Sequence, residues 1–291
     1  MNSPRFDTPT SPAEGNYAYK IVGDHRVELT FLPPTEKKFD RAPVYFIIPG
    51  GGWHEASKEA MIGFSKKSSD MLRARGWATV SIDYRVAPRD DVDMIGIVSD
   101  AIDAGRFLAH FADVLEINPR RIVTSGHSAG GHLAMMMALA PHAGFTVDSP
   151  YDIREDAFEV VATAPLSPPI VLYRDAAGFC PQAFEFEGRG LFDKGSLTEQ
   201  AALRHRGSPI DYVTPLSVPT LLVYGTHDNL VFAENSTKHY ERCRTVGAPC
   251  KLLPSVYGGH CFEPMVEGKT SAPDFSQVQD EVYQFVVAFE G

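Results

Sequence analysis

Several features that mark membrane, disulfide-rich or metal-binding proteins are missing from this 291-residue sequence. The four cysteines are too few for a disulfide scaffold, and they form no C-x-x-C pair, so neither a zinc ribbon nor a thioredoxin-type site is indicated. No stretch approaches the run of about 18 apolar residues that a transmembrane helix requires. Residues 1–16 also lack the apolar core of a signal peptide. We therefore expect no membrane span and a cytoplasmic location.

Positive charge is also in short supply. The chain has 27 Lys and Arg against 37 Asp and Glu, which gives a net charge of −10. Nucleic acid and anionic membranes are bound mainly through cations, so we expect neither as a partner. Hydrophobic residues make up 44% and charged residues 22%, which is ordinary globular usage and sufficient for a sizeable core. This composition excludes a disordered chain, a collagen and a coiled coil.

Short apolar runs alternate with segments of helical periodicity along the chain. Strands are expected at 27–31, 43–49, 77–84, 121–125, 160–164, 220–224 and 251–256, and helices at 58–75, 91–115, 128–140, 232–246 and 275–289. Asn118-Pro119 is expected to form a turn before the fourth strand. This alternation predicts an α/β fold with a mostly parallel central sheet covered by helices on both faces.

The expected domain organisation is simple. Residues 1–16, rich in Pro, Ser and Thr, are expected to be a flexible N-terminal arm, and residues 17–291 a single α/β domain. Residues 166–210 interrupt the regular alternation with Pro, Gly and Phe. Long irregular segments inside such domains are usually functional, so this one is interpreted as a cap over a pocket. A purely structural excursion is the alternative.

The strongest chemical signal is Gly126-His-Ser128-Ala-Gly130-Gly131. It follows an expected strand and opens an expected helix, which is the context of the G-x-S-x-G nucleophile elbow. The tight turn would expose the Ser128 hydroxyl, and the helix N-terminus would present N–H groups to a developing negative charge. An incidental serine in a glycine-rich turn is the alternative. A dinucleotide-binding loop would have glycine where Ser128 stands.

A serine nucleophile needs a base, and the base needs an acid to orient it. His260 lies between the last expected strand and helix, where Gly258 and Gly259 allow the backbone to bring an imidazole into a cleft. Asp228 directly follows an expected buried strand, at the end where such sheets place their sites. The order Ser128, Asp228, His260 is the expected one for this arrangement.

Other candidates for the base and the acid are weaker. His239 is expected at the surface of a helix, while His127 and His132 are too close to Ser128 in the chain to reach its hydroxyl easily. His127 is expected to flank the pocket and His132 to lie on the buried helix. Asp211, the main rival of Asp228, precedes its strand instead of following it.

Acyl transfer also needs donors for an oxyanion. Gly50-Gly51-Gly52-Trp53 follows the strand at 43–49, and glycines there let backbone N–H groups approach a substrate. We assign the donors to the N–H groups of Gly51, Gly52 and Ala129, with a plain flexible loop as the alternative.

Substrate contacts are less clearly indicated. The candidates are Trp53, for which packing in the core is the alternative, and His127, Phe179 and Phe184. No metal and no cofactor are expected, because His54-Glu55 begins an H-E-x-x-H pattern that Lys58 interrupts. Cys243 and Cys250 could pair if the protein were exported.

Taken together, these residues resemble those of α/β-hydrolases of the hormone-sensitive-lipase-like group, which includes bacterial carboxylesterases and small feruloyl or acetylxylan esterases. The matching pieces are Gly50-Gly51-Gly52, Asp83-Tyr-Arg-Val-Ala-Pro88, Gly126-His-Ser-Ala-Gly130, Asp228 and His260. The resemblance implies an α/β-hydrolase fold and a serine esterase. One departure is Pro49, where many members have His, and it removes a side chain that helps to anchor the glycine loop.

A second resemblance leaves the substrate class open. Gly51-Gly-Trp53 with Ser57-Lys58, and Gly126-His-Ser-Ala-Gly-Gly-His-Leu133, are similar to kynurenine formamidases, which use the same triad on an aryl formamide. The leading expectation is a small-molecule ester with a small to medium apolar or aryl group. Formamide hydrolysis and a non-catalytic binding protein on the same fold are the alternatives. Whether the protein forms a homodimer stays open.

Overall fold

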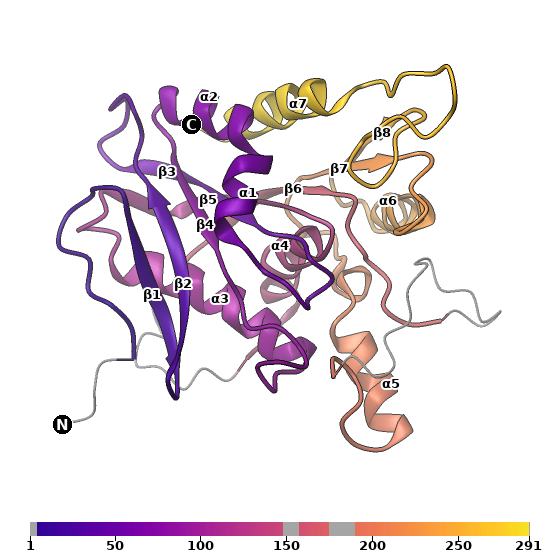
Figure 1. The fold of residues 1–291 in the computed structure, drawn as a ribbon, viewed down its shortest axis with the longest axis horizontal. Helices are drawn as coiled ribbons and strands as arrows, with labels where there is room; N and C mark the ends of the chain where they lie inside the picture. The colour runs from indigo at the N-terminus through magenta and orange to yellow at the C-terminus, as the bar shows by residue number, and fades with distance from the viewer. Residues whose placement is uncertain (1–4, 148–156, 175–189, 291) are drawn as a thin grey trace.

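The computed structural model describes residues 5–147, 157–174 and 190–290. These residues build a sheet with the strand order β1-β2-β4-β3-β5-β6-β7-β8 (Figure 1). The strands are β1 (Gly15–Val22), β2 (His25–Leu32), β3 (Ala42–Ile48), β4 (Ala78–Ile82), β5 (Ile117–His127), β6 (Val160–Leu166), β7 (Thr220–Gly225) and β8 (Cys250–Ser255). From β4 to β8 each strand runs parallel to its neighbour, and only β1 and β2 are antiparallel additions at one edge. The expected mostly parallel sheet is confirmed.

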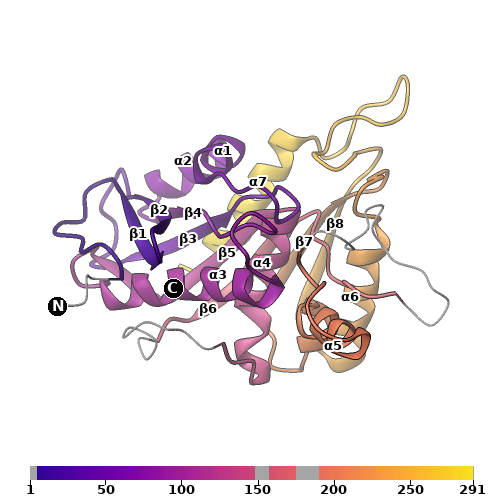
Figure 2. The same ribbon diagram turned by 60° about the horizontal axis from the view of Figure 1, so that its bottom comes forward.

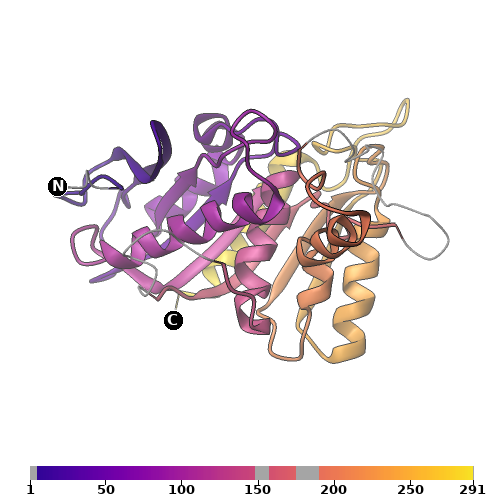
Figure 3. The same cartoon turned by 90° about the horizontal axis from the view of Figure 1, so that it is seen from below.

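Helices cover both faces of this sheet. They are α1 (Lys58–Phe64), α2 (Lys66–Ala74), α3 (Met94–His110), α4 (Ala129–Leu139), α5 (Leu197–Arg206), α6 (Glu234–Val246) and α7 (Phe275–Val287), with the short 3-10 helices η1 (Pro141–Ala143) and η2 (Pro209–Tyr212). Helices α3, α4 and α6 lie on one face, and α1, α2 and α7 lie on the other (Figure 3). Helix α5 lies at the side of the molecule that holds β7, β8 and α6, away from β1 (Figure 2).

The central strands are buried on both faces, as their continuous apolar runs predict. Along β3, Val44 and Phe46 pack into the core beneath α3 and α4, whereas Tyr45 and Ile47 pack into the core beneath α2 and α7. This alternation fixes the register of the strand, because a shift by one residue would exchange the two faces. The position of the loop that follows β3 is therefore fixed relative to the neighbouring strands.

The N-terminal segment differs from the expected flexible arm. The backbone N–H of Asp7 donates to Ala18 O at 2.8 Å, and that of Ile21 donates to Arg5 O at 2.9 Å. Phe6 packs edge-on against Phe107 of α3, with ring centroids 6.3 Å apart. Residues 5–7 thus run beside β1, which composition alone did not indicate because the partners lie on other elements.

Two further boundaries also differ from expectation. The helix expected at 58–75 is divided at Ser65, which ends α1 and precedes α2. Asn118 and Pro119 lie inside β5, because Ala42 of β3 pairs with Ile117 and starts the strand early. None of the helices in the described ranges combines the length and the apolar composition needed to cross a bilayer.

Candidate active site

Five neighbouring strands end at the same edge of the sheet, and each is followed by a residue of the site. Gly51 follows β3, Ser128 follows β5, Ser167 follows β6, Asp228 follows β7 and His260 follows β8. The carboxyl ends of parallel strands are where open α/β sheets hold their ligands. The order of the strands therefore brings together residues that are up to 209 positions apart in the chain.

Ser128 sits in a sharp turn between β5 and α4. Its φ of 55° and ψ of −122° are unfavourable for a residue with a Cβ, so the surrounding structure must hold the turn. The backbone N–H of Ser128 donates to Leu166 O of β6 at 2.8 Å. Gly130 passes so close to β3 that a Cβ there would lie 2.0 Å from Ile48 O. A strained turn from strand to helix is the geometry that a nucleophile elbow requires, and the role of Ser128 as nucleophile stays a prediction.

Asp228 and His260 form a hydrogen-bonded pair. His260 Nδ1 lies 2.7 Å from Asp228 Oδ2, and the Asp228 side chain is buried. The other carboxylate oxygen, Oδ1, accepts from the backbone N–H groups of Leu230 and Val231, both at 2.9 Å. Asp228 therefore caps its loop and orients the imidazole at the same time. Since a carboxylate only accepts, the proton of this hydrogen bond is on Nδ1, and in the neutral imidazole Nε2 then carries the free lone pair.

The backbone of His260 is held by two groups to which the sequence assigned no such role. His127 Nε2 and Ser167 Oγ lie 2.9 Å and 3.0 Å from the carbonyl oxygen of His260 and donate to it. The His127 ring packs between Phe64 and His260, with centroids 4.8 Å and 4.7 Å away. Burial, and then the neighbouring His260, lower the pKa of His127 to about 4. His127 is thus neutral at pH 7, with its proton on Nε2.

The glycine loop lies directly against Ser128. A Cβ on Gly50 would lie 3.3 Å from Ser128 Cβ. Among the described residues we find no acceptor for the N–H groups of Gly51 and Gly52, and the N–H of Ala129 opens α4 without an intrahelical acceptor. These are the donors predicted for an oxyanion, and their assignment stays a prediction.

Tyr84 anchors this loop. Its buried hydroxyl lies 3.0 Å from Pro49 O, 3.3 Å from Glu55 O and 3.4 Å from Gly50 O. Asp83 holds the start of α1, because its Oδ1 accepts from the Lys58 N–H at 2.8 Å. Tyr84 and Asp83, which follow β4, therefore hold the glycine loop in place. Pro49 itself has no side-chain group that could form a hydrogen bond.

Replacing Gly51 with alanine should lower kcat about 10²–10³-fold, which is the usual cost of an oxyanion donor. Gly51 has a φ of 121°, and a Cβ there would lie 2.4 Å from Glu55 O, so the loop would have to shift. Gly52 offers a matched control. Its φ is also positive, at 58°, but a Cβ there would meet nothing closer than 3.9 Å. Steady-state kinetics on p-nitrophenyl butyrate should show the larger loss for Gly51→Ala, and equal losses would contradict this account.

A cavity of about 460 Å³ opens beside the glycine loop. It is lined by Pro49, Gly50, Gly51, Glu55, Ala56, Ser57, Ala60, Met61, Phe64, Arg89 and His127. His127 flanks the cavity as predicted.

The other candidate substrate contacts do not line this cavity. Trp53 is wholly buried and packs edge-on against His132, so its side chain belongs to the core, the alternative left open by the sequence. Phe179 and Phe184 lie outside the described residues.

The rejected candidates lie elsewhere. Asp211 accepts hydrogen bonds from Tyr173 and His205 and does not contact His260. His132 is buried on α4 as predicted, with Nε2 2.7 Å from Gly207 O. The expectation that His239 lies at the surface is wrong, since its side chain is wholly buried on α6. The sequence did not indicate this burial, because the buried residues of α6 are themselves mostly polar and form no apolar stripe.

Ser167 is the functional neighbour that the sequence analysis missed. It follows β6 in the same way that Ser128 follows β5, and its φ of 45° is also positive. Its position directly after an apolar run is a signal that could have drawn attention to it. Its contact with the His260 backbone depends on the pairing of β6 with β7, which no local pattern encodes.

Comparison with solved structures identifies the fold. Esterase 2 of the planctomycete Thermogutta terrifontis superposes with a TM-score of 0.75 over 96% of this chain and 93% of that chain, at 24% sequence identity. Its apo form gives a TM-score of 0.77. The fold is the expected α/β-hydrolase fold.

Sequence comparison identifies the family. The chain is 28% identical to esterase LipC of Mycobacterium tuberculosis over 253 residues, and 27% identical to an acetylxylan esterase of Xylanibacter ruminicola over 252 residues. These matches cover 80% and 84% of this chain, but it spans only about half the length of either relative (56% and 46%). The sequence model of the BD-FAE family matches residues 30–242, which include Gly51, Ser128 and Asp228. The chain therefore belongs to the BD-FAE family.

Proposed function

We propose that this protein is a serine esterase that hydrolyses a small-molecule carboxylic ester through an acyl-enzyme. The observation that carries the proposal is the 2.7 Å hydrogen bond between His260 and Asp228 at the sheet edge where Ser128 projects from its strained turn. The names of the relatives LipC and acetylxylan esterase support the same class of reaction.

In the first half of the reaction, Ser128 Oγ attacks the ester carbonyl carbon while His260 Nε2 takes its proton. Asp228 stabilises the imidazolium that results. Among the described residues, Ser128 Oγ has no hydrogen-bond partner, and contacts between nucleophile and base commonly tighten only when substrate binds. The N–H groups of Gly51, Gly52 and Ala129 then stabilise the oxyanion.

In the second half, His260 gives its proton to the leaving alkoxide and the carbon–oxygen bond breaks. Water then attacks the acyl-enzyme, with His260 Nε2 accepting its proton and returning it to Ser128 Oγ as the acid leaves. The hydrogen bonds of His127 and Ser167 to the His260 carbonyl keep the imidazole in place through both halves. Positioning of this kind supplies a large part of enzymatic rate enhancement.

The cavity beside the glycine loop favours a substrate of modest size with an apolar or aryl group. Ala56, Ala60, Met61 and Phe64 give its wall an apolar surface, and Phe64 offers an aromatic ring next to His127. We propose further that the segment 166–210 caps the site, since Ser167 at its start contacts the His260 carbonyl and Ile170 N–H donates to Asn235 Oδ1 of α6 at 2.8 Å. Residues 175–189 of this segment lie outside the described residues. The cytoplasmic location stays a prediction.

Parallel assays on p-nitrophenyl acetate, butyrate and octanoate, methyl ferulate and N-formylkynurenine test the proposed substrate class, with Ser128→Ala as the blank. We expect turnover of the short esters and negligible cleavage of the formamide. The triad itself cannot separate the two, because an ester and a formamide pass through similar tetrahedral intermediates. Efficient cleavage of N-formylkynurenine with slow ester turnover would overturn the ester assignment and support the formamidase alternative.

A further inference from the structure

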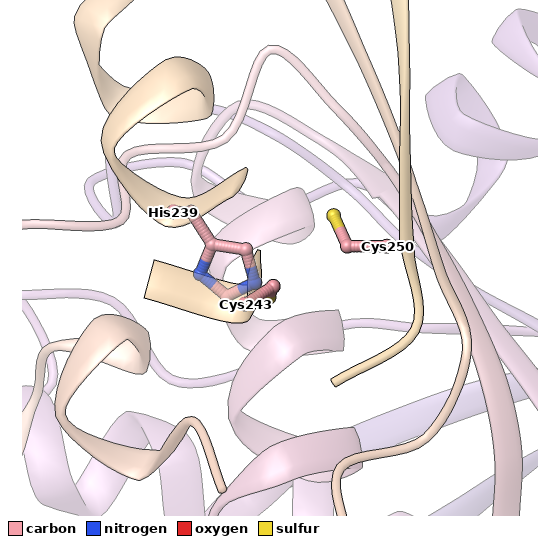
Figure 4. Close-up of side chains that lie close together, drawn as sticks. All are labelled: His239, Cys243 and Cys250. Carbon is pink, nitrogen blue, oxygen red and sulfur yellow. The ribbon is translucent and has the colours of Figure 1, made fainter. Parts of the chain in front are cut away.

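A cluster of metal-binding side chains lies outside the candidate active site. His239 and Cys243 project from α6 four residues apart, which places them on the same side of the helix. Cys250 is the first residue of β8, which α6 packs against. The nearest His nitrogen and the two Sγ atoms all lie within 4.8 Å of one another (Figure 4).

The cluster is buried, and its histidine makes no hydrogen bond to the rest of the described residues. The side chain of His239 is 0% exposed and that of Cys243 is 2% exposed. Among the described residues, neither ring nitrogen of His239 has a hydrogen-bond partner. A buried imidazole without partners is costly, and unsatisfied groups of this kind in folded proteins call for an explanation such as an ion.

We propose that His239, Cys243 and Cys250 bind a thiophilic metal ion, with Zn²⁺ the best match to the ligand set. Two thiolates and one imidazole suit Zn²⁺, while the absence of carboxylate ligands from the trio disfavours Ca²⁺ and Mg²⁺. A tetrahedral zinc with these ligands needs ligand atoms about 3.5–3.8 Å apart, so the ligand atoms, which lie within 4.8 Å of one another, must approach by at most about 1.3 Å. Three protein ligands leave a fourth position for water.

The position of the cluster gives the ion a structural role. Cys250 stands at the amino end of β8, whereas His260 follows the carboxyl end of the same strand. Strand β8 is the last in the sheet and has β7 as its only neighbour in the strand order of the described residues. An ion held by α6 and β8 would fasten this edge strand to the helix that covers it. Because the ion would bind the folded state and not the unfolded one, it would raise the free energy of unfolding.

A disulfide between Cys243 and Cys250 is the competing explanation for the two thiols. It would leave both nitrogens of His239 unsatisfied, so the three-residue arrangement favours the metal. The two explanations make opposite predictions for the reduced protein, which takes up an ion only if the metal site exists.

Titration of reduced, chelator-treated and tag-free protein with Co²⁺ tests the site. We expect one equivalent to bind with a thiolate-to-cobalt charge-transfer band, and excess Zn²⁺ to displace it. At about a hundredfold excess over Kd, Zn²⁺ should raise Tm by about 5 °C. Cys250→Ser, at the half-buried member of the cluster, should lose the band and the shift in Tm while keeping ester hydrolysis. Cys261→Ser, at an exposed cysteine outside the cluster, is the matched control and should keep the charge-transfer band and the shift in Tm.

Two results would overturn the proposal. One is a reduced wild-type protein that shows neither the band nor a shift in Tm. The other is a band that persists in both Cys250→Ser and Cys243→Ala. A Cys243–Cys250 disulfide found by mass spectrometry, together with no metal uptake after reduction, would assign the thiols to redox chemistry instead. Since ester hydrolysis is read separately, failure of the metal site does not affect the proposed function.

Discussion

Replacing Ser128 with alanine should abolish ester hydrolysis, with kcat falling about 10⁵–10⁶-fold, as loss of a serine nucleophile does elsewhere. The reason is chemical and not structural. Alanine at the same φ of 55° has the same Cβ and backbone contacts, so the turn between β5 and α4 should survive. Only the hydroxyl that attacks the carbonyl is removed. The measurement is kcat on p-nitrophenyl butyrate, together with covalent labelling by a fluorophosphonate.

Ser167→Ala is the matched control for this prediction. Ser167 stands at the equivalent position after the adjacent strand, also with a positive φ, and its hydroxyl donates to the backbone carbonyl oxygen of His260. Its loss should slow turnover modestly and leave fluorophosphonate labelling intact. A folded wild-type protein that is not labelled at all would support a non-catalytic binding protein, and labelling that survives Ser128→Ala would place the nucleophile elsewhere.

Replacing Asp228 with asparagine should lower kcat about 10⁴-fold with little change in stability. The carboxamide is the same size as the carboxylate. Its oxygen will face the N–H groups of Leu230 and Val231, which donate to Oδ1 in the native protein. The NH₂ group must then face His260 Nδ1, which can no longer donate. The imidazole adopts the other tautomer, and its Nε2 carries a proton and cannot act as a base.

Asp211→Asn provides the control for Asp228→Asn. Asp211 is the other acid considered from the sequence, and its carboxylate contacts His205 and Tyr173 at the surface instead of His260. Its substitution should leave kcat unchanged. Thermal unfolding of both variants, followed by circular dichroism, checks that they fold. If Asp228→Asn reduced kcat by less than about tenfold, the orienting role assigned to Asp228 would be incorrect.

Local sequence patterns predicted the parallel strands and the helices that cover them. The continuous apolar run of β3 and the helical spacing of apolar residues in α3 are each set by the few residues inside one element. The predicted ends of strands and helices were less accurate where a neighbouring element decides where they begin. Strand β5 starts at Ile117, before Asn118-Pro119, because β3 pairs with it there. Residues 5–7 lie beside β1, where Phe6 packs against Phe107 of α3.

The sequence by itself determined the fold class, and it predicted the glycine loop and the trio Ser128, Asp228 and His260, because each of them follows an expected strand in a recognisable local context. Only the tertiary structure decided what supports them. The contact of Ser167 with the His260 backbone and the burial of His239 beside Cys250 depend on which strands become neighbours. Such contacts join residues far apart in the chain, and their free energy comes from packing that no local window of sequence contains.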